Sequence, residues 1–219
     1  MAFLGNDVAQ TTENTRKAIL PPHSIRRDFL PPELVGELLA YALANEERFV
    51  ASGVGQHDTA RIDSAMRRSS KLADLGRYKP LLRERLAPLA PGLTAELKTS
   101  PFEAAKIEVE LVAHGDGAFY LPHLDTQQVA ATDPRRVQRM LSRVYYFHAK
   151  PKAFGGGELR LHETIPKSPD GAFVDVEPLH NSLVSFPAWM RHEVRPVSVP
   201  SRRFADSRFA INIWFNRAV

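Results

Sequence analysis

A series of short runs with period-two alternation fills the chain from Pro101 onward and restricts its possible folds more than any other feature. Residues two apart on a strand point to the same side, so this alternation predicts strands with one buried and one exposed face. Clusters of Gly, Pro, Asn and Asp separate the runs and favour turns. Such short antiparallel strands predict a sandwich or a jelly-roll, cupin-like barrel. The predicted strands cover residues 107–111, 142–148, 158–162, 172–176, 182–186, 192–197 and 208–215.

The first hundred residues have a different pattern, which predicts helices. Residues 33–45 follow two prolines and carry apolar side chains at helical spacing. A leucine stripe at 82–97 is also helical in spacing, but two internal prolines must divide or kink it. We therefore expect a single α+β domain. Its parts would be a polar, mobile arm at 1–20, mainly helical support at 21–100 and a strand-rich core at 101–219.

Composition excludes several kinds of site. The 219 residues suffice for one well-buried core, and the absence of cysteine excludes disulfides, thiolate metal sites and cysteine nucleophiles. Any metal would have to be held by His, Asp or Glu. No apolar stretch reaches the length of a membrane span, and residues 1–17 contain no apolar signal core. We expect a cytoplasmic protein with no membrane partner.

The basic charge raises the question of a polyanionic partner. The net charge is +4 and the isoelectric point is about 9.5, with arginines concentrated at 135–143 and 191–208. No aromatic-plus-basic motif accompanies these arginines, so we interpret them as a solvated basic rim and expect no nucleic-acid partner. A carboxylate-bearing substrate or cosubstrate would use the same charge.

His123, Asp125 and the distant His192 are the candidate metal ligands. On an extended strand the first two point to the same side, roughly 6–7 Å apart along the chain, so both can reach one ion. Both histidines lie at ends of predicted strands, where side chains of one barrel face a common interior. Two histidines and one carboxylate leave open positions on an octahedral metal, as in non-heme Fe(II) oxygenases. The alternative is that His192 is an ordinary structural histidine.

The last predicted strand begins with Arg208 and carries Ala210, Asn212 and Trp214 on the same face. An arginine on an inward face needs an anion to offset its desolvation, and a planar guanidinium pairs best with a carboxylate. The small Ala210 leaves room for a ligand. The alternative partner for Arg208 is an internal Asp or Glu.

In their order along the chain, these motifs resemble those of the 2-oxoglutarate and Fe(II)-dependent oxygenases, within them the prolyl-4-hydroxylase-like branch. The resemblance spans residues 107–215 and implies a double-stranded β-helix with supporting N-terminal helices. Its motifs are a Gly-rich turn into His123-Leu124-Asp125, then Arg143-Val144-Tyr145-Tyr146, Gly156-Gly157-Glu158-Leu159, Trp189-Met190-Arg191-His192-Glu193-Val194, and finally Arg208 before Trp214.

The family implies a reaction as well as a fold. Fe(II) would be held by His123, Asp125 and His192, which are then also the catalytic residues. The cosubstrates would be 2-oxoglutarate and O2, with ascorbate as a further candidate cofactor. Hydroxylation of an unactivated C–H bond would accompany the formation of succinate and CO2. The carboxylate of Asp125 favours hydroxylation over halogenation, because related halogenases lack this ligand.

The family also implies which residues hold 2-oxoglutarate. Arg208 would bind the far carboxylate, although Arg202 lies nearer the usual interval after His192. We prefer Arg208 because its strand register matches Trp214, with the intervening residues as a loop insertion. The family often carries a tyrosine at the position of His114. Hydrogen bonds to the cosubstrate are therefore assigned to Tyr120, Tyr145 or His114.

The segment from Thr126 to Met140 is long, polar and basic, and we interpret it as a mobile lid that selects the substrate. A prolyl residue, another amino acid or peptide, and a small metabolite are all open as substrates. The sequence leaves the oligomeric state open, with a homodimer as one candidate. The candidate substrate-contacting residues are Gln127, Arg135, Arg143 and Trp214.

Three other functions fit parts of the pattern. A nucleic-acid demethylase of the same superfamily would suit the basic charge, but its Arg-x-Asn motif is not matched after Arg208. A non-catalytic barrel could bind metal or 2-oxoglutarate as a sensor or scaffold. A zinc hydrolase could use the same three ligands, yet no adjacent glutamate of the metalloprotease kind is present.

Overall fold

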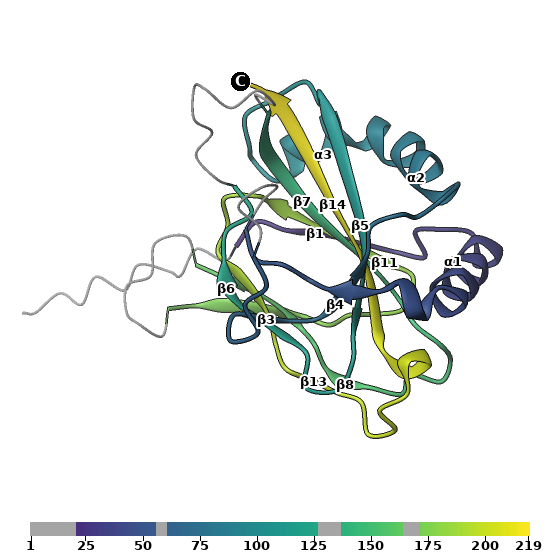
Figure 1. Cartoon of the computed structure of the whole chain (residues 1–219). Helices are drawn as coiled ribbons and strands as arrows, with labels where there is room; N and C mark the ends of the chain where they lie inside the picture. Colours follow the sequence, from purple (N-terminus) through teal and green to yellow (C-terminus); the bar gives the residue numbers. More distant parts are fainter. Residues whose placement is uncertain (1–20, 56–60, 127–136, 164–170) are drawn as a thin grey trace, which may run out of the picture.

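The computed structural model of the chain describes residues 21–55, 61–126, 137–163 and 171–219 (Figure 1). The predicted arm and most of the predicted lid, including Gln127 and Arg135, lie outside these residues. The helices are α1 (Pro32–Ala44), α2 (Tyr78–Leu86) and α3 (Ala90–Glu96), with short 3₁₀ turns at Glu46–Arg48, Ala87–Leu89 and Phe204–Asp206. The strands are β1 (Ser24–Arg27), β2 (Val50–Ala51), β3 (Arg67–Arg68), β4 (Ser70–Leu72), β5 (Lys106–His114), β6 (Phe119–His123), β7 (Val137–Phe147), β8 (Gly155–Gly156), β9 (Leu159–His162), β10 (Phe173–Val176), β11 (Ser182–Pro187), β12 (His192–Val194), β13 (Val197–Ser198) and β14 (Arg208–Ala218).

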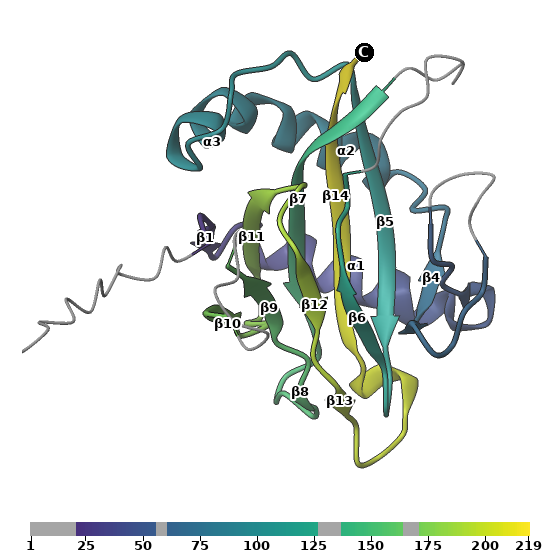
Figure 2. The same ribbon diagram turned by 90° about the vertical axis from the view of Figure 1, so that its left-hand side faces the viewer.

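Two antiparallel sheets face each other. Among the described residues, the major sheet has the order β1-β11-β7-β14-β5-β4-β2 and the minor sheet has the order β10-β9-β12-β6-β3. The minor sheet lies in front of the major sheet in Figure 2, and α1 lies behind it. The small β13–β8 pair closes one end of the structure. The architecture is the predicted α+β double-stranded β-helix with N-terminal helices.

The three helices cover the outer face of the major sheet. Their buried side chains join alternate residues of β5, β7, β11 and β14 in one hydrophobic core. In α1 these side chains recur at helical spacing, so one stripe of the helix faces the sheet. Every helix in the described part of the chain is too short or too polar to cross a membrane. The side chains that α1 contributes to this core are Leu34, Val35, Leu38 and Ala42.

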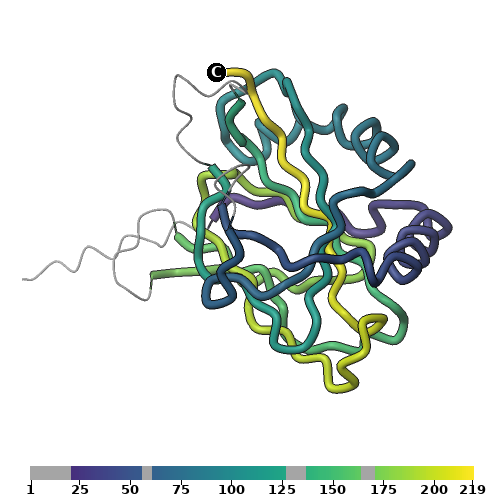
Figure 3. The backbone as a smooth tube through the Cα atoms, in the orientation of Figure 1, coloured from purple at the N-terminus to yellow at the C-terminus, as the bar shows by residue number. Residues whose placement is uncertain are grey.

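A second, smaller core fills the space between the sheets. It includes Tyr146 from β7, Leu161 from β9, Phe186 from β11 and Ala210 from β14. Strand β14 runs between β7 and β5 along its length (Figure 3). Its odd-numbered residues from Phe209 to Phe215 join the helix-side core, and its even-numbered residues from Arg208 to Trp214 face the space between the sheets. The predicted alternation of this strand is therefore confirmed.

Two boundary predictions need correction. The segment 21–100 is not only helical support, because β1, β2 and β4 extend the major sheet and β3 extends the minor sheet. These strands are only two to four residues long, too short for period-two alternation to be recognised. Strand β7 begins at Val137, so the end of the predicted lid is a strand. The polar residues at the start of β7 show no period-two alternation. They form a strand because their backbones pair with the end of β14.

We predict that Leu38→Ala lowers the free energy of unfolding by about 3 kcal/mol, because it leaves a cavity where α1 packs on the major sheet. Leu38 is 1% exposed. Ile62→Ala is the matched control, because Ile62 is 63% exposed and its truncation should cost less than about 0.5 kcal/mol. Urea denaturation measures both values. Equal losses in the two variants would contradict this description of the core.

Candidate functional site

A cavity of about 330 Å³ lies between the two sheets, and most of the predicted site residues that the structure describes border it. His123 and Asp125 come from the end of β6 and the residues after it, His192 opens β12, and Arg208 opens β14. Strands β6 and β12 are paired with His123 directly opposite His192. The backbone N–H groups of Asp125 and Thr126 both donate to the carbonyl of Ala188, which holds the segment after β6 against the turn before β12.

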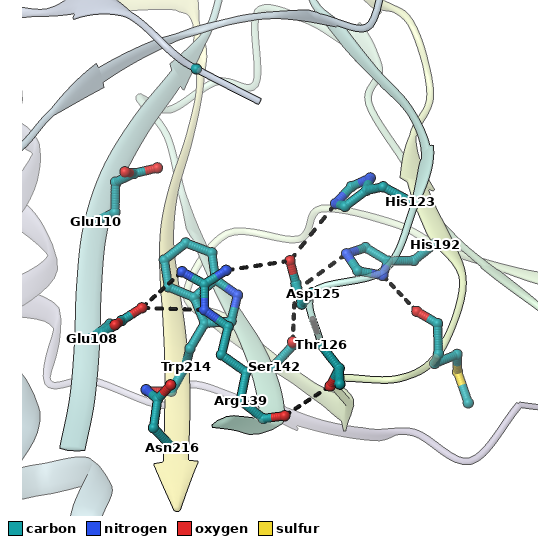
Figure 4. Close-up of polar contacts among 12 residues, drawn as sticks. Glu108, Glu110, His123, Asp125, Thr126, Arg139, Ser142, His192, Trp214 and Asn216 are labelled. Carbon is teal, nitrogen blue, oxygen red and sulfur yellow. Dashed lines mark hydrogen bonds and ion pairs between the residues drawn. The ribbon is translucent and has the colours of Figure 1, made fainter. Parts of the chain in front are cut away.

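His123, Asp125 and His192 converge on one point, as Figure 4 shows. One ligand atom from each lies within 4.8 Å of the others. The Asp125 Oδ1 atom lies 3.9 Å from His123 Nε2, and its Oδ2 atom lies 3.5 Å from His192 Nε2. Two imidazole nitrogens and one carboxylate that converge in this way can hold a divalent metal on one face. The sequence prediction of these three ligands agrees with this geometry.

Backbone carbonyls fix the orientation of both imidazoles. His123 Nδ1 donates to the Leu121 carbonyl at 2.8 Å, and His192 Nδ1 donates to the Met190 carbonyl at the same distance. A carbonyl can only accept, so the proton of each neutral ring lies on Nδ1 and the lone pair lies on Nε2. Both Nε2 atoms face Asp125 (Figure 4). The rings are therefore preset to ligate a metal through Nε2.

Burial and neighbouring charge set the protonation of the ligands. Burial, together with the nearby His192, lowers the pKa of His123 well below its usual range, so this ring is neutral at pH 7. Burial alone would raise the pKa of Asp125. The two histidines, Arg139 and a hydrogen bond from Ser142 outweigh burial, so the pKa of Asp125 is lowered. Protons therefore do not compete with a metal at these two ligands near pH 7.

Asp125 is held in place by groups that the sequence prediction missed. Ser142 Oγ donates to Asp125 Oδ2 at 2.6 Å, and Arg139 Nη1 lies 3.9 Å from Oδ1. Arg139 itself donates through Nη2 and Nε to Glu108 at 2.7 and 3.2 Å and lies 3.9 Å from the centre of the Trp214 ring. The alternation of β7 could have placed Ser142 on the inner face, but only pairing with β14 reveals the position of Arg139.

Arg208 is 1% exposed and borders the cavity. Its Nε donates to the Gly157 carbonyl at 2.8 Å, and its Nη1 donates to His114 Nδ1 at 3.1 Å. The guanidinium also lies over the Tyr146 ring, 4.7 Å from its centre. Gly157 has φ +75°, and a Cβ there would meet Arg208 Cδ at 2.6 Å, so a side chain at 157 would displace Arg208.

His114 supports the arginine as a neutral base. Burial, and then the positive charges of Arg208 and Arg67, lower the pKa of His114 well below its usual range. The neutral ring therefore accepts a hydrogen bond from Arg208 and leaves the positive charge of the guanidinium uncompensated. No Asp or Glu among the described residues pairs with Arg208, so its remaining N–H groups suit an anionic ligand.

The two candidate arginines differ in their position relative to the cavity. Arg202 has an 83% exposed side chain that lies 3.5 Å from Asp116, and it does not border the cavity. Arg208 does border it. Residues 199–206 form a surface loop with one 3₁₀ turn, which accounts for the long interval between His192 and Arg208.

Two sequence assignments are wrong because β7 alternates. Tyr145 points to the helix side, where its hydroxyl donates to Asn181 at 2.9 Å, so it cannot bind a ligand in the cavity. Tyr146 faces the cavity in its place, and burial raises its pKa to about 12. Arg143 borders the cavity, but its guanidinium donates to Ser185 and to the Leu86 carbonyl on the helix side. Its charged group is therefore directed away from the cavity.

Two further predicted residues lie on the cavity wall. Tyr120 stacks on His123 with ring centres 3.5 Å apart, and Trp214 lies beneath Arg139. Charged residues from the strands beside them complete this wall, which no sequence motif predicted. They are Arg67, Lys71, Glu108 and Glu110.

We predict that Ser142→Ala lowers the affinity for a divalent metal about 10-fold, because Asp125 loses the hydrogen bond that orients its carboxylate. Calorimetric titration with Fe(II) under anaerobic conditions measures this. Ser201→Ala is the matched control, since Ser201 Oγ donates to Asp206 at 2.5 Å and neither residue borders the cavity. An unchanged affinity in Ser142→Ala would contradict this role.

Comparison of the sequence with known proteins finds oxygenases of the kind that the motifs resemble. Residues 109–216 match the family described as the 2OG-Fe(II) oxygenase superfamily. An uncharacterized PKHD-type hydroxylase of Synechocystis sp. is 36% identical over 195 residues, which cover 87% of this chain and 62% of that protein. The chain thus spans less than two thirds of the length of this relative.

Solved structures share the fold. The crystal structure of a Pseudomonas putida prolyl-4-hydroxylase has a TM-score of 0.64 and 26% identity, covering 90% of this chain and 94% of that one. A Trichoplax adhaerens prolyl hydroxylase, solved with a hypoxia inducible factor peptide fragment, has a TM-score of 0.60 and 19% identity, covering 89% and 83%. The family match contains His123, Asp125, His192 and Arg208, and together these comparisons support a 2OG-Fe(II) oxygenase similar to the prolyl-4-hydroxylases.

Proposed function

We propose that this chain is a 2-oxoglutarate- and Fe(II)-dependent dioxygenase that hydroxylates an unactivated C–H bond. One observation carries the proposal: a His-Asp-His ligand set and a buried arginine without an acidic partner among the described residues border the same cavity. The ligand set fits ferrous iron, because both Nε2 lone pairs and the carboxylate face one point. A zinc hydrolase would leave Arg208 without a purpose.

The protein residues bind and orient the reactants. His123, Asp125 and His192 would hold iron, and Arg208 would pair with the far carboxylate of 2-oxoglutarate through two parallel hydrogen bonds. When bound, iron supplies the redox chemistry that couples decarboxylation of 2-oxoglutarate by O2 to hydroxylation. One oxygen atom then enters succinate, the other enters the substrate hydroxyl group, and CO2 is released. The buried cavity around Arg208 keeps water from that ion pair.

The substrate side of the cavity is polar. Tyr120 and His114 are proposed to hydrogen-bond the cosubstrate, and Trp214 to contact the substrate. We propose an amino-acid, peptide-like or small-metabolite substrate, since the relatives include hydroxylases and prolyl-4-hydroxylases. Ascorbate as an additional cofactor, a cytoplasmic location and a homodimer are proposed from the family resemblance and composition alone.

We predict that Arg208→Met raises the 2-oxoglutarate concentration for half-saturation about 100-fold, which corresponds to roughly 3 kcal/mol. The measurement is anaerobic visible absorption of the Fe(II)-loaded protein during titration with 2-oxoglutarate, where chelation produces a weak charge-transfer band. No band in the wild type despite bound iron would contradict the proposed function and favour a zinc enzyme or a scaffold.

Arg143→Met is the matched control for this titration. Both arginines are 1% exposed, but Arg143 lies on the helix side of β7, where one of its nitrogens has no hydrogen-bond partner among the described residues. Burial lowers the pKa of Arg143 to about 9, which reflects this poorly compensated charge. Arg143→Met should therefore leave the titration unchanged and keep or raise the melting temperature.

We predict that Asp125→Ala abolishes the formation of succinate, because a neutral methyl group removes the only carboxylate of the ligand set. Succinate is measured by mass spectrometry with Fe(II), 2-oxoglutarate and O2, with and without candidate substrates. Asp206→Ala is the control, since this carboxylate lies in the surface loop before Arg208 and pairs with Arg203. Retained turnover in Asp125→Ala would contradict the assignment of the ligand.

A further inference from the structure

Arg67 is an arginine of β3 whose side chain is only 10% exposed, and it belongs neither to the metal ligands nor to the cosubstrate site. We propose that Arg67 is a positioning residue that holds the Tyr120 ring against the metal ligand His123. Through its bond to the Gly53 carbonyl, Arg67 also fixes the segment around Gly53 beside the cavity. The proposal rests on the proposed function only in that His123 binds the metal.

Three groups form a continuous stack. The Arg67 guanidinium carbon lies 4.9 Å from the centre of the Tyr120 ring. The Tyr120 ring in turn lies 3.5 Å from the centre of the His123 ring, and the two planes differ by 17°. Strand pairing imposes the first contact, because Arg67 is directly opposite Tyr120 in the β3–β6 ladder. Strand β3 is therefore connected to the metal site by side chains as well as by backbone hydrogen bonds.

The orientation of the guanidinium is set independently of Tyr120. Arg67 Nη1 donates to the Gly53 carbonyl at 3.0 Å, and Nε donates to Ser69 Oγ at 3.0 Å. Nη2 lies 3.6 Å from Glu110 Oε1, and the other oxygen of Glu110 accepts from Lys71 at 3.2 Å. A planar guanidinium held at several nitrogens has little freedom to rotate, so it presents a fixed face to the aromatic ring.

This arrangement restricts the imidazole of His123 in the direction that its hydrogen bond leaves free. The bond from Nδ1 to the Leu121 carbonyl fixes one edge of the ring but permits tilting about that edge. Tyr120 contacts the imidazole through near-parallel stacking, and the His192 ring lies 4.2 Å from it at an angle of 56°. Removal of Arg67 would release Tyr120, and His123 could then tilt away from Asp125.

The neighbouring Arg68 provides a matched comparison within the same strand. It also lies over an aromatic ring of β6, with its guanidinium carbon 5.6 Å from the centre of Phe119. Arg68 is exposed and does not border the cavity. A cation–π contact is stronger in a desolvated site than at an exposed one. The two arginines therefore share chemistry and differ in their connection to His123.

The test compares Arg67→Ala with Arg68→Ala in the full chain. Anaerobic calorimetry measures Fe(II) affinity, and visible absorption measures the position of the Fe(II)–2-oxoglutarate band. We expect Arg67→Ala to weaken Fe(II) binding about 10-fold and to shift the band, and Arg68→Ala to change neither. Amide hydrogen exchange of residues 50–55 should accelerate only in Arg67→Ala. Equal affinity and an equal band position in the two variants would overturn the proposal.

Two further variants separate positioning from general destabilisation. Tyr120→Leu keeps Arg67 and its bonds to Gly53 and Ser69, and it should weaken Fe(II) binding as Arg67→Ala does. Tyr120→Phe removes the hydroxyl proposed to bind the cosubstrate but retains the stacked ring, so it should keep the wild-type Fe(II) affinity measured without 2-oxoglutarate. If Tyr120→Leu also keeps the wild-type affinity, the proposal is overturned even when Arg67→Ala does not fold. Failure of the proposed function is a different result, in which the wild type binds Fe(II) but shows no band with 2-oxoglutarate.

Discussion

The pairing of β6 with β12 is the constraint on which the candidate site depends. It places His123 opposite His192, and the hydrogen bonds from Asp125 and Thr126 to Ala188 continue the contact beyond the strands. His192 lies far along the chain from His123 and Asp125, so no local structure could bring all three ligands together. The carbonyls of Leu121 and Met190 then set both imidazoles for ligation through Nε2, before any metal binds.

The major sheet separates two environments that treat a buried charge differently. On its inner face, Arg208 is held by the Gly157 carbonyl and a neutral His114, and its remaining N–H groups are available to an anion. On its outer face, Arg143 lies among apolar helix residues, with a serine and one carbonyl as partners. Desolvation penalises both guanidinium groups, but a dicarboxylate ligand can compensate only the inner one. The burial of an arginine therefore does not indicate its function unless the face of the sheet to which its side chain points is also known.

Layers of support extend outward from the metal ligands. Asp125 is bonded by Ser142 and approached by Arg139, which Glu108 and Trp214 hold in turn. On the other side, His123 is stacked on Tyr120 and then on Arg67. The supporting residues come from β3, β5, β6, β7 and β14, so both sheets contribute to one site. Misplacement of a ligand by even about 1 Å can reduce catalysis strongly, which gives this support a functional reason.

The sequence by itself determined the class of fold and the chemical types in the site. Alternation predicted most strands of the core, helical spacing predicted α1, and His123, Asp125, His192 and Arg208 could be named because their residue types suit one metal and one carboxylate. Only the tertiary structure decided which of two adjacent tyrosines faces the cavity and that Arg143 points to the helices. It also showed that Arg139 approaches Asp125 and that Arg67 contacts Tyr120, which stacks on His123. The physical reason is that period-two alternation defines two faces without saying which is inside. That choice depends on the register between strands far apart in the chain, and a shift of one residue would exchange the two faces.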